Sequence, residues 1–380
     1  MSLPQGVMDA FEAHYGYKPA YLVRAPGRVN LIGEHTDYNE GFVFPMAIDR
    51  NVWLAAAPRV DTTVHAYSMD LGSSFEMDTA QIGSHADGWG RYVQGVAWAL
   101  REGGHQLMGW DGVITSDVPI GSGLSSSAAL ELAVARCFAK SSEIVWNASP
   151  MAVLCQKAEN QWVGMNCGIM DQLIIAEGKR DHALLMDCRS LELKPVRMPQ
   201  DVVVVIMDTA TRRGLVDSAY NERRQQCETA SRFFGVPYLR DVSLATFEQK
   251  SHALSEALQM RSRHVISENE RTTASFEAMV AGDVIKLGQL MDESHTSLRD
   301  DYEVTNEALD TIVTIARSHG AALGARMTGA GFGGCAIALV KKEEANDFAT
   351  YLSEAYQQQT GLTPSVYVCQ AEQGVSVEDW

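Results

Sequence analysis

The chain has 380 residues, 46% of them hydrophobic and 21% charged, which predicts an ordinary globular protein with two domains rather than a single core. Its 31 basic residues against 48 acidic ones give a net charge of -17, and no dense block of Lys or Arg appears. This charge disfavours nucleic acids and anionic membranes as partners and favours small molecules.

The N-terminal segment, MSLPQGVMDAFEAHYGY, has no basic stretch followed by an apolar one. The longest aliphatic run, residues 202–207, is far too short to cross a bilayer. We therefore expect a cytoplasmic protein. The seven cysteines are scattered without C-x-x-C spacing, which predicts core thiols rather than disulfides or a zinc site.

The first half of the chain alternates between strand-like and helix-like patterns, which predicts a mixed α/β architecture. A helix is expected over residues 91–101, because its apolar positions share one face and it stops at a glycine pair. Short runs of apolar or β-branched residues, bounded by Gly, Pro or Asp, predict strands at 21–24, 52–57, 63–68, 112–115 and 183–187.

The stretch PIGSGLSSSAAL at 119–130 packs two glycines and four serines ahead of a helix-like run. It lacks the lysine of G-x-x-x-x-G-K-[ST] and the third glycine of G-x-G-x-x-G. Its glycines still let a ligand approach the backbone, and a helix beginning near Ser125 would direct unpaired N–H groups at that ligand. A phosphate-binding loop and a plain serine-capped turn both remain open on this pattern.

A phosphate site without lysine needs another positive charge. A magnesium ion held by a serine hydroxyl and a carboxylate would supply it, since Mg²⁺ prefers oxygen ligands. A helix is predicted to start with Ser149 as its N-cap and Pro150 in its first turn, and Glu159 borders the apolar face of that helix. Glu159 is the candidate ligand, and a solvated surface glutamate is the alternative.

The stretch APGRVNLIGEHTDY at 25–38 ends in a dense polar cluster that includes Glu34, His35, Thr36 and Asp37. Such density is typical of a site for a ligand with many hydroxyl groups, because carboxylates accept hydrogen bonds from them. A metal site built from Glu34, His35 and Asp37 is the alternative, although adjacent residues rarely converge on one ion. An exposed polar loop is the third possibility.

Two further motifs follow. Asp171, in GIMDQ, is a lone carboxylate among apolar residues at a helix start, where it is either an N-terminal cap or a functional base. The run MTGAGFGGC at 327–335 has four glycines between strand-like pieces, which predicts a tight hairpin or a close approach of backbone to a ligand.

A domain boundary is predicted before the aliphatic run at 202–207, because Pro195 and Pro199 interrupt the pattern there. The predicted domains are therefore 1–198 and 199–380. The second is expected to hold helices near 217–233, 261–281 and 303–318 and strands near 335–340 and 365–369.

Taken together, these motifs resemble the successive signatures of galactokinases, members of the galacto-, homoserine, mevalonate and phosphomevalonate (GHMP) kinase superfamily. GEHTDY and GIMDQ in this order and spacing are specific to galactokinases, and the likeness is closest to the bacterial enzymes. The segments that carry it are APGRVNLIGEHTDY at 25–38, GSGLSSSAA at 121–129, AENQWVGMNCGIMDQ at 158–172, SAYNERRQQCE at 218–228 and MTGAGFGGC at 327–335.

The resemblance implies transfer of the γ-phosphoryl group of ATP to the C1 hydroxyl of D-galactose, with Mg²⁺, by a monomer. It also implies a two-domain GHMP kinase fold of α/β and α+β type. Its N-terminal domain would be like domain 2 of ribosomal protein S5, its C-terminal domain would be ferredoxin-like, and the active site would lie between them.

By the same resemblance, Asp171 would be the catalytic base and Arg28 its partner. The galactose site would consist of Glu34, His35, Thr36, Asp37 and Tyr220. The magnesium ligands would be Ser127 and Glu159. The ATP-binding residues would be Ser68, Gly121, Ser122, Gly123, Leu124, Ser125, Ser126 and Ser127.

One position departs from the family pattern: Ala330 stands where galactokinases usually have the middle glycine of MTGGGFGGC. If that residue needs a positive φ, alanine is unfavourable there. Three other functions stay open: a kinase for N-acetylgalactosamine or another sugar, a non-catalytic galactose and ATP sensor, and a two-carboxylate glycosidase using Glu34 and Asp171.

Overall fold

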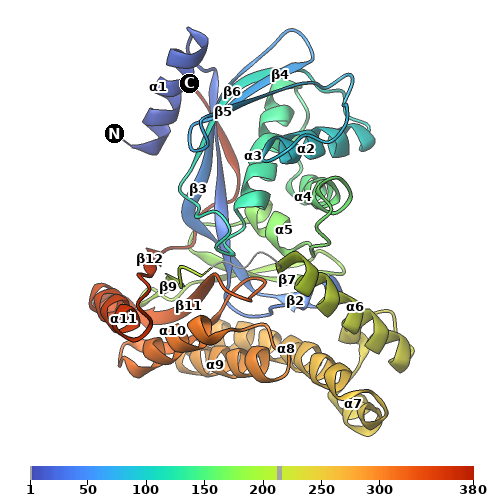
Figure 1. Ribbon diagram of the computed structural model, residues 1–380, viewed down its shortest axis with the longest axis vertical. Coiled ribbons are helices and arrows are strands. Elements are labelled where there is room, and N and C mark those ends of the chain that lie inside the picture. Colours follow the sequence, from blue (N-terminus) through green and yellow to red (C-terminus); the bar gives the residue numbers. More distant parts are fainter. Residues whose placement is uncertain (1, 212–215) are drawn as a thin grey trace.

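The computed structural model describes residues 2–211 and 216–380, which form two units, each a β-sheet with helices packed against it (Figure 1). The first unit fills the upper part of Figure 1, and both ends of the chain lie in it. The last residue, Trp380, donates its N–H to the carbonyl of Ala20. The second unit lies below it.

The first sheet has the strand order β13-β1-β3-β6-β4-β5. Its β4–β6 pair is parallel, whereas the other neighbouring strands are antiparallel. Four predicted strands of this sheet are confirmed, and three of them extend further than their apolar runs suggested: β1 (Tyr21–Asn30), β3 (Pro45–Pro58), β4 (Thr63–Ser68) and β6 (Trp110–Ser116). The sheet also contains β5 (Ser73–Asp78) and β13 (Ser376–Asp379), which were not predicted.

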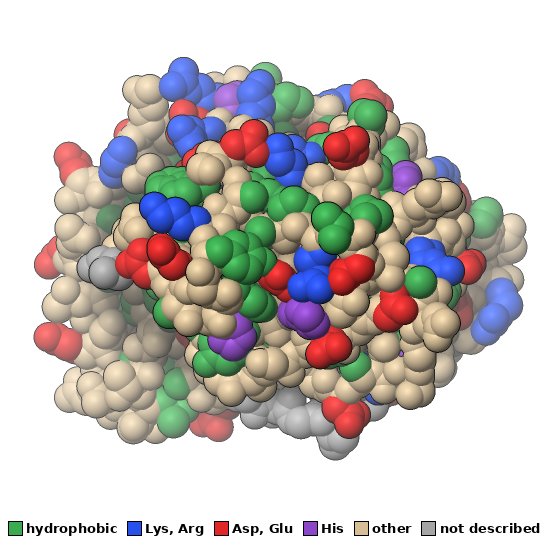
Figure 2. Space-filling view, turned by 90° about the horizontal axis from the view of Figure 1, so that it is seen from above, with side chains coloured by type: hydrophobic (Ala, Val, Ile, Leu, Met, Phe, Trp, Pro, Cys, Tyr) green, Lys and Arg blue, Asp and Glu red, His purple; other side chains and the backbone are tan. Residues whose placement is uncertain are grey.

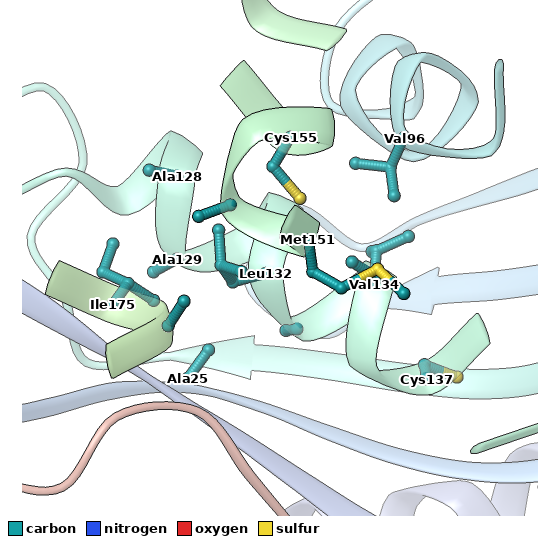
Figure 3. Close-up of a cluster of buried hydrophobic side chains, with 14 of the residues drawn as sticks. Ala25, Val96, Ala128, Ala129, Leu132, Val134, Cys137, Met151, Cys155 and Ile175 are labelled. Carbon is teal, nitrogen blue, oxygen red and sulfur yellow. The ribbon is translucent and has the colours of Figure 1, made fainter. Parts of the chain in front are cut away.

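Both faces of this sheet are covered. Helix α1 (Leu3–Tyr15) packs on one face through a small core that includes Val7 and Phe11. The opposite face carries a larger core, in which Val96, Leu132 and Ile175 belong to one cluster although they come from three helices (Figure 3). The helices on that side are α2 (Gly90–Glu102), α3 (Ser126–Ser141), α4 (Ala148–Lys157) and α5 (Met170–Glu177).

The second sheet is antiparallel with the order β10-β11-β9-β12. Every residue of the inner strand β9 is buried. Its residues on one face pack among helices of the second unit, and those on the other face pack against the first unit and residues 278–291. This burial on both faces explains its uninterrupted aliphatic run. The strands are β9 (Val202–Asp208), β10 (Ala322–Met327), β11 (Cys335–Lys341) and β12 (Ser365–Cys369).

Helices of the second unit pack below and beside this sheet (Figure 1). They are α6 (Val216–Phe234), α7 (Leu244–Lys250), α8 (Glu256–Val280), α9 (Val284–Asp300), α10 (Glu307–Ser318) and α11 (Ala345–Thr360). A small third sheet, β2-β7-β8, lies at the junction, formed by β2 (Phe42–Val43), β7 (His182–Asp187) and β8 (Leu193–Arg197).

A shared core joins the two units. Val29 and Leu31 from the β1 region pack in one cluster with Val204 and Ile206 of β9. The division at 198 and 199 therefore stays a prediction, and one part of it needs correction: β13, which was expected in the second unit, pairs with β1 in the first sheet.

The start of helix α4 differs from the prediction. The helix begins at Ala148 with Asn147 as its N-cap, so Ser149 is not the cap. The hydroxyl of Ser149 instead donates to Glu177 at 2.5 Å.

The cysteines lie mostly in the interior. Six of the seven are buried, as core thiols should be. No helix in the described part of the chain is long and apolar enough to cross a membrane.

The charged surface is mixed. On the face shown in Figure 2, acidic and basic side chains of the described residues are interspersed rather than gathered into a patch of one sign. This distribution agrees with the expectation of small-molecule partners.

The core beneath α3 should control the stability of the first unit. Leu132 is fully buried there (Figure 3), so we expect Leu132→Ala to lower the free energy of unfolding by about 2–5 kcal/mol. Urea unfolding followed by circular dichroism would measure the change. Val60→Ala, at a side chain that is 99% exposed, is the control and should change stability little. Equal stabilities for the two variants would contradict this account of the core.

Candidate active site

Arg28 enters the site from an irregularity in β1. The register between β1 and β3 shifts between Pro26 and Arg28, and such a bulge redirects the side chain beside it. The N–H of Arg28 donates to the carbonyl of Leu124 at 3.1 Å. A Cβ on Gly27 would lie 2.9 Å from that carbonyl, so glycine lets the strand contact the glycine–serine loop directly.

Asp171, at the start of α5, accepts hydrogen bonds on both carboxylate oxygens. Arg28 donates from Nε to Oδ1 at 2.7 Å and from Nη2 to Oδ2 at 2.8 Å. Ser125 Oγ donates to Oδ2 at 2.5 Å, while Nη1 of Arg28 donates to the carbonyl of Gly123. This two-bond geometry fixes the positions of both charged groups and gives the buried Arg28, which is only 4% exposed, a partner of opposite charge.

The glycine–serine loop leads directly into α3. Gly121 and Gly123 have φ values of 67° and 86°, which favour glycine, and Ser125 adopts a φ of 62° at the helix N-cap. The Ser125 hydroxyl bonds Asp171 rather than its own helix. Since Ser126 and Ser127 line a cavity, the unpaired N–H groups of the first helical turn lie at that cavity.

Glu159 is buried, with 5% of its surface exposed, so the alternative of a solvated surface glutamate is wrong. Helix α4 continues into a π-helical turn over Ala158–Val163, and this wider turn carries Glu159. The Oγ of Ser127 donates to Glu159 Oε1 at 3.1 Å. Burial first, and the charge of Asp171 second, raise the pKa of Glu159.

Glu34 is almost completely buried, and its carboxylate is held within the protein. Its Oε1 accepts from the N–H of Gly329 at 2.8 Å and from Thr328 Oγ1 at 3.0 Å, and its Oε2 accepts from Asn30 Nδ2 at 2.9 Å. These bonds attach the polar turn of the first unit to the third glycine motif of the second.

His35 adopts a φ of 63° and is buried beside two tyrosines. Its Nδ1 lies 2.9 Å from Tyr38 Oη, and its Nε2 lies 3.2 Å from the carbonyl of Ala330. Burial lowers the pKa of His35 to about 3, so the ring is neutral at physiological pH. The ring of Tyr220, from α6, lies 5.5 Å from that of His35 and is tilted by 40° to it.

Asp37 follows in the same turn and accepts a hydrogen bond from the N–H of Tyr38 at 2.9 Å. Burial first, and the charge of Asp171 second, raise the pKa of Asp37 from 3.8 to about 7. A Cβ on Gly168 would lie 2.0 Å from Asp37 Oδ2. Because Gly168 has no side chain, the Asp37 carboxylate can occupy this space.

The third glycine motif connects β10 to β11 as a hairpin, and it also packs on the glycine–serine loop. A Cβ on Gly334 would lie 2.8 Å from the carbonyl of Ser122, and one on Gly329 would lie 3.0 Å from that of Gly123. Ala330 is not among the residues with positive φ, so alanine brings no backbone strain at that position.

These segments enclose a cavity of about 570 Å³, a size typical of small-molecule sites. It brings together residues from both units of the fold. The predicted site residues that line it are Arg28, Glu34, His35, Asp37, Gly121, Ser122, Gly123, Ser125, Ser126, Ser127, Glu159, Asp171 and Tyr220.

Comparisons with known proteins agree with this geometry. Three family models match: the galactokinase galactose-binding signature over residues 9–58, the GHMP kinases N terminal domain over 91–179, and the GHMP kinases C terminal domain over 275–358. A galactokinase of Roseiflexus sp. (strain RS-1) is 49% identical over 372 residues, which cover 97% of this chain and 95% of that protein. The chain belongs to the galactokinase family.

Solved structures of this family and of a related kinase have the same fold. The crystal structure of Lactococcus lactis galactokinase complexed with galactose matches with a TM-score of 0.94 and 37% identity, covering 99% of this chain and 100% of that one. The Methanococcus jannaschii mevalonate kinase, 18% identical, matches with a TM-score of 0.64 over 93% of this chain and 99% of that one, which shows a common GHMP kinase fold. As a galactokinase family member, the protein is an ATP-dependent kinase that phosphorylates galactose.

Three predicted site residues do not line the cavity. Thr36 is buried, and its hydroxyl donates to the carbonyls of Gly33 and Phe42. Leu124 anchors the glycine–serine loop in the shared core. Ser68 is buried at the end of β4, where its hydroxyl accepts from the N–H of Leu71.

The alternative of a metal site at Glu34, His35 and Asp37 has no support. Their hydrogen bonds run to Gly329, Ala330 and the N–H of Tyr38, three separate directions. In residues 2–211 and 216–380, no group of three His, Cys, Asp or Glu side chains is arranged to hold a metal ion.

The sequence also left functional contacts unassigned. The bond from Ser125 to Asp171, the space that Gly168 leaves for Asp37, and the contact of Gln172 with Glu159 all depend on tertiary structure. The one available signal was that Gly168 and Gln172 belong to the same motif as Asp171.

The raised pKa of Asp37 predicts a pH-dependent stability. The folded chain holds the proton of the Asp37 carboxyl more tightly than the unfolded chain does. The stability that this proton contributes is therefore fully present below about pH 3.8 and is lost as the pH rises through about 7. Asp37→Asn, which removes the charge, should therefore stabilise the ligand-free protein, by an amount that grows between pH 4.5 and 8. Urea unfolding across that range measures it.

The exposed Asp87→Asn is the control for this test and should show no such trend. A pH-independent difference between Asp37→Asn and the parent protein would show that Asp37 ionises normally in the folded chain.

Proposed function

We propose that this cavity binds D-galactose and the triphosphate of ATP side by side, and that Asp171 lies where the C1 hydroxyl meets the γ-phosphate. The observation that carries the proposal is the position of Asp171. Through Ser125 it contacts the glycine–serine loop, and its charge raises the pKa of Asp37 in the polar turn. It is therefore adjacent to the ATP side and the sugar side at once.

Asp171 would accept the hydrogen bond of the C1 hydroxyl and orient its oxygen for in-line attack on the γ-phosphorus. The new O–P bond forms as the bond to the ADP oxygen breaks, and the hydroxyl proton passes to Asp171. Because this carboxylate also accepts from Arg28 and Ser125, its position relative to the glycine–serine loop is fixed. Positioning of the reacting groups dominates phosphoryl transfer, so orienting the C1 hydroxyl would be the larger part of its role.

Arg28 would serve two groups at once. Its Nε and Nη2 hold Asp171, and Arg28 also lines the cavity, where its positive charge would stabilise the phosphoryl oxygens in the transition state. The lysine missing from the loop is thus replaced in part by an arginine from β1.

Sugar recognition would rest on Asp37, the neutral His35 and Tyr220, which line the cavity beside Asp171. Asp37 is the better acceptor for a sugar hydroxyl than Glu34, since the Glu34 carboxylate is occupied by internal donors. We propose Glu34 as the residue that fixes the turn. An epimer that left a buried polar group unpaired would bind poorly, which gives selectivity for the axial 4-hydroxyl of galactose.

Ser127 and Glu159 fit a magnesium ion. They offer a hydroxyl and a carboxylate oxygen 3.1 Å apart at the cavity wall, which is the donor type that Mg²⁺ prefers. When bound, the ion would neutralise charge on the phosphate oxygens.

We also propose that the protein acts as a monomer in the cytoplasm, where ATP is available. One chain contributes both the proposed sugar contacts and the proposed phosphate loop, so a second chain is not needed to complete the cavity.

Asp171→Asn tests the proposed reaction. It keeps the shape of the side chain, removes the base and weakens the bond to Arg28, so we expect kcat to fall by roughly 10²–10⁴-fold while galactose binding stays measurable. A coupled ADP-release assay with the parent protein should give turnover on galactose and little on glucose or N-acetylgalactosamine.

The matched control is Asp241→Asn, since Asp241 also accepts two bonds from one arginine, Arg189, but on the surface. Its kcat should be unchanged. Near-parental turnover by Asp171→Asn would remove the role proposed for this carboxylate.

Ser127→Ala and Glu159→Gln test the metal ligands. Each should raise the Mg²⁺ concentration needed for half-maximal activity by about tenfold or more, because one oxygen ligand is lost or loses its charge. Ser149→Ala is the matched control, since it also removes a serine-to-glutamate hydrogen bond, but one outside the cavity. Unchanged Mg²⁺ titrations for both site variants would mean that the ligands lie elsewhere.

A further inference from the structure

A chain of three buried polar side chains lies behind the cavity wall: Glu131 on α3, Gln172 on α5 and Glu159 in the π-helical turn. Glu131 and Gln172 are completely buried, and Glu159 is 5% exposed. Placing two carboxyl groups and an amide in an apolar core is unfavourable unless their hydrogen bonds are satisfied. Such a cluster needs an explanation beyond packing.

Gln172 links the two carboxyl groups. Its Nε2 donates to Glu159 Oε2 at 2.5 Å and to Glu131 Oε2 at 3.1 Å. The other oxygen of Glu159, Oε1, accepts from Ser127 Oγ. The amide therefore holds the inner oxygen of Glu159 and leaves the outer oxygen beside Ser127 at the cavity.

Two oxygen atoms of this chain lack a hydrogen-bond partner among the described residues: Oε1 of Glu131 and Oε1 of Gln172. Both are acceptors when Glu131 is ionised, so neither can satisfy the other. A proton on Glu131 would supply the missing donor and make an acid–amide pair, in which the acid accepts from Nε2 and donates to the amide oxygen. Burial first, and the charge of Glu159 second, raise the pKa of Glu131 well above its usual value, which agrees with a neutral acid.

The acid–amide pair would fix the orientation of the Gln172 amide. With its oxygen bonded to Glu131, Gln172 can present only its NH₂ group to Glu159. A flipped amide would place two acceptors against each other and leave buried donors unpaired. Glu131 therefore determines that the NH₂ group of Gln172, and not its C=O group, contacts Glu159.

We propose that Gln172 is a positioning residue for the metal site: it orients Glu159 so that Oε1 stays beside Ser127, and Glu131 in turn fixes the amide of Gln172. This inference rests on the proposed role of Ser127 and Glu159 as magnesium ligands. Residues that hydrogen-bond a ligating side chain typically change metal affinity or activity by 10–100-fold when they are replaced.

Gln172→Met is the direct test, since methionine keeps the length of the side chain and removes its hydrogen bonds. The measurement is Mn²⁺ binding to the complex of the protein with ADP, followed by the electron paramagnetic resonance signal of free Mn²⁺. We expect about tenfold weaker Mn²⁺ binding, with an unchanged galactose dissociation constant by calorimetry. Gln94→Met is the control, because Gln94 is also buried but bonds only backbone groups outside the cavity.

A second pair of variants separates positioning from loss of folding. Glu131→Gln can rebuild the neutral pair, since its amide offers one acceptor and one donor to Gln172, and it should retain Mn²⁺ affinity. Glu131→Leu cannot, and it should weaken Mn²⁺ binding about as much as Gln172→Met. These variants also provide the test if Gln172→Met does not fold.

The outcomes distinguish this inference from the function proposed above. If Glu159→Gln weakens Mn²⁺ binding but Gln172→Met and Glu131→Leu do not, the positioning role is overturned and the metal site stands. If Glu159→Gln itself binds Mn²⁺ as tightly as the parent protein, the ligand assignment fails and the positioning role fails with it. Weakening by Gln172→Met that disappears in the Glu159→Gln background supports the inference, because the two residues then act through one contact.

Discussion

The ion pair between the buried Arg28 and the part-buried Asp171 is the constraint on which the site depends. Arg28 is 4% exposed, and a buried guanidinium is strongly unfavourable without a charged partner. The pair joins β1 to the start of α5, and Arg28 also bonds the glycine–serine loop at Gly123. Three segments that are distant in sequence are thus fixed against each other by one side chain.

The cavity that results is acidic, although a kinase must admit a triphosphate. The charge of Asp171 contributes to the raised pKa of both Asp37 and Glu159, so the ligand-free site contains repulsion that hydroxyl donors and a cation relieve. The whole chain, with a net charge of -17, does not attract ATP from a distance. We therefore propose that ATP binding depends on short-range partners: Arg28, the N–H groups at the start of α3, and a metal ion.

Local patterns predicted what depends on local structure. The aliphatic run of β9, the strand at 63–68 and a helix beginning near Ser125 were all readable, because periodicity and turn residues determine them. The π-helical turn that buries Glu159 was not, since a helical pattern does not show an inserted residue. The return of β13 to the first sheet is a long-range pairing with no local signal.

The candidate site divides in the same way. Motifs located its residues, but their roles depend on contacts between distant segments: the hydroxyl of Ser125, expected at the phosphate, bonds Asp171, and Thr36, expected at the sugar, holds its own turn. The Asp171–Gln172 pair shows why. Successive side chains on a helix point about 100° apart, so Asp171 faces the cavity whereas Gln172 faces Glu131 in the core. Because Leu173 and Ile174 are fully buried, α5 cannot rotate, and its packing fixes both orientations together.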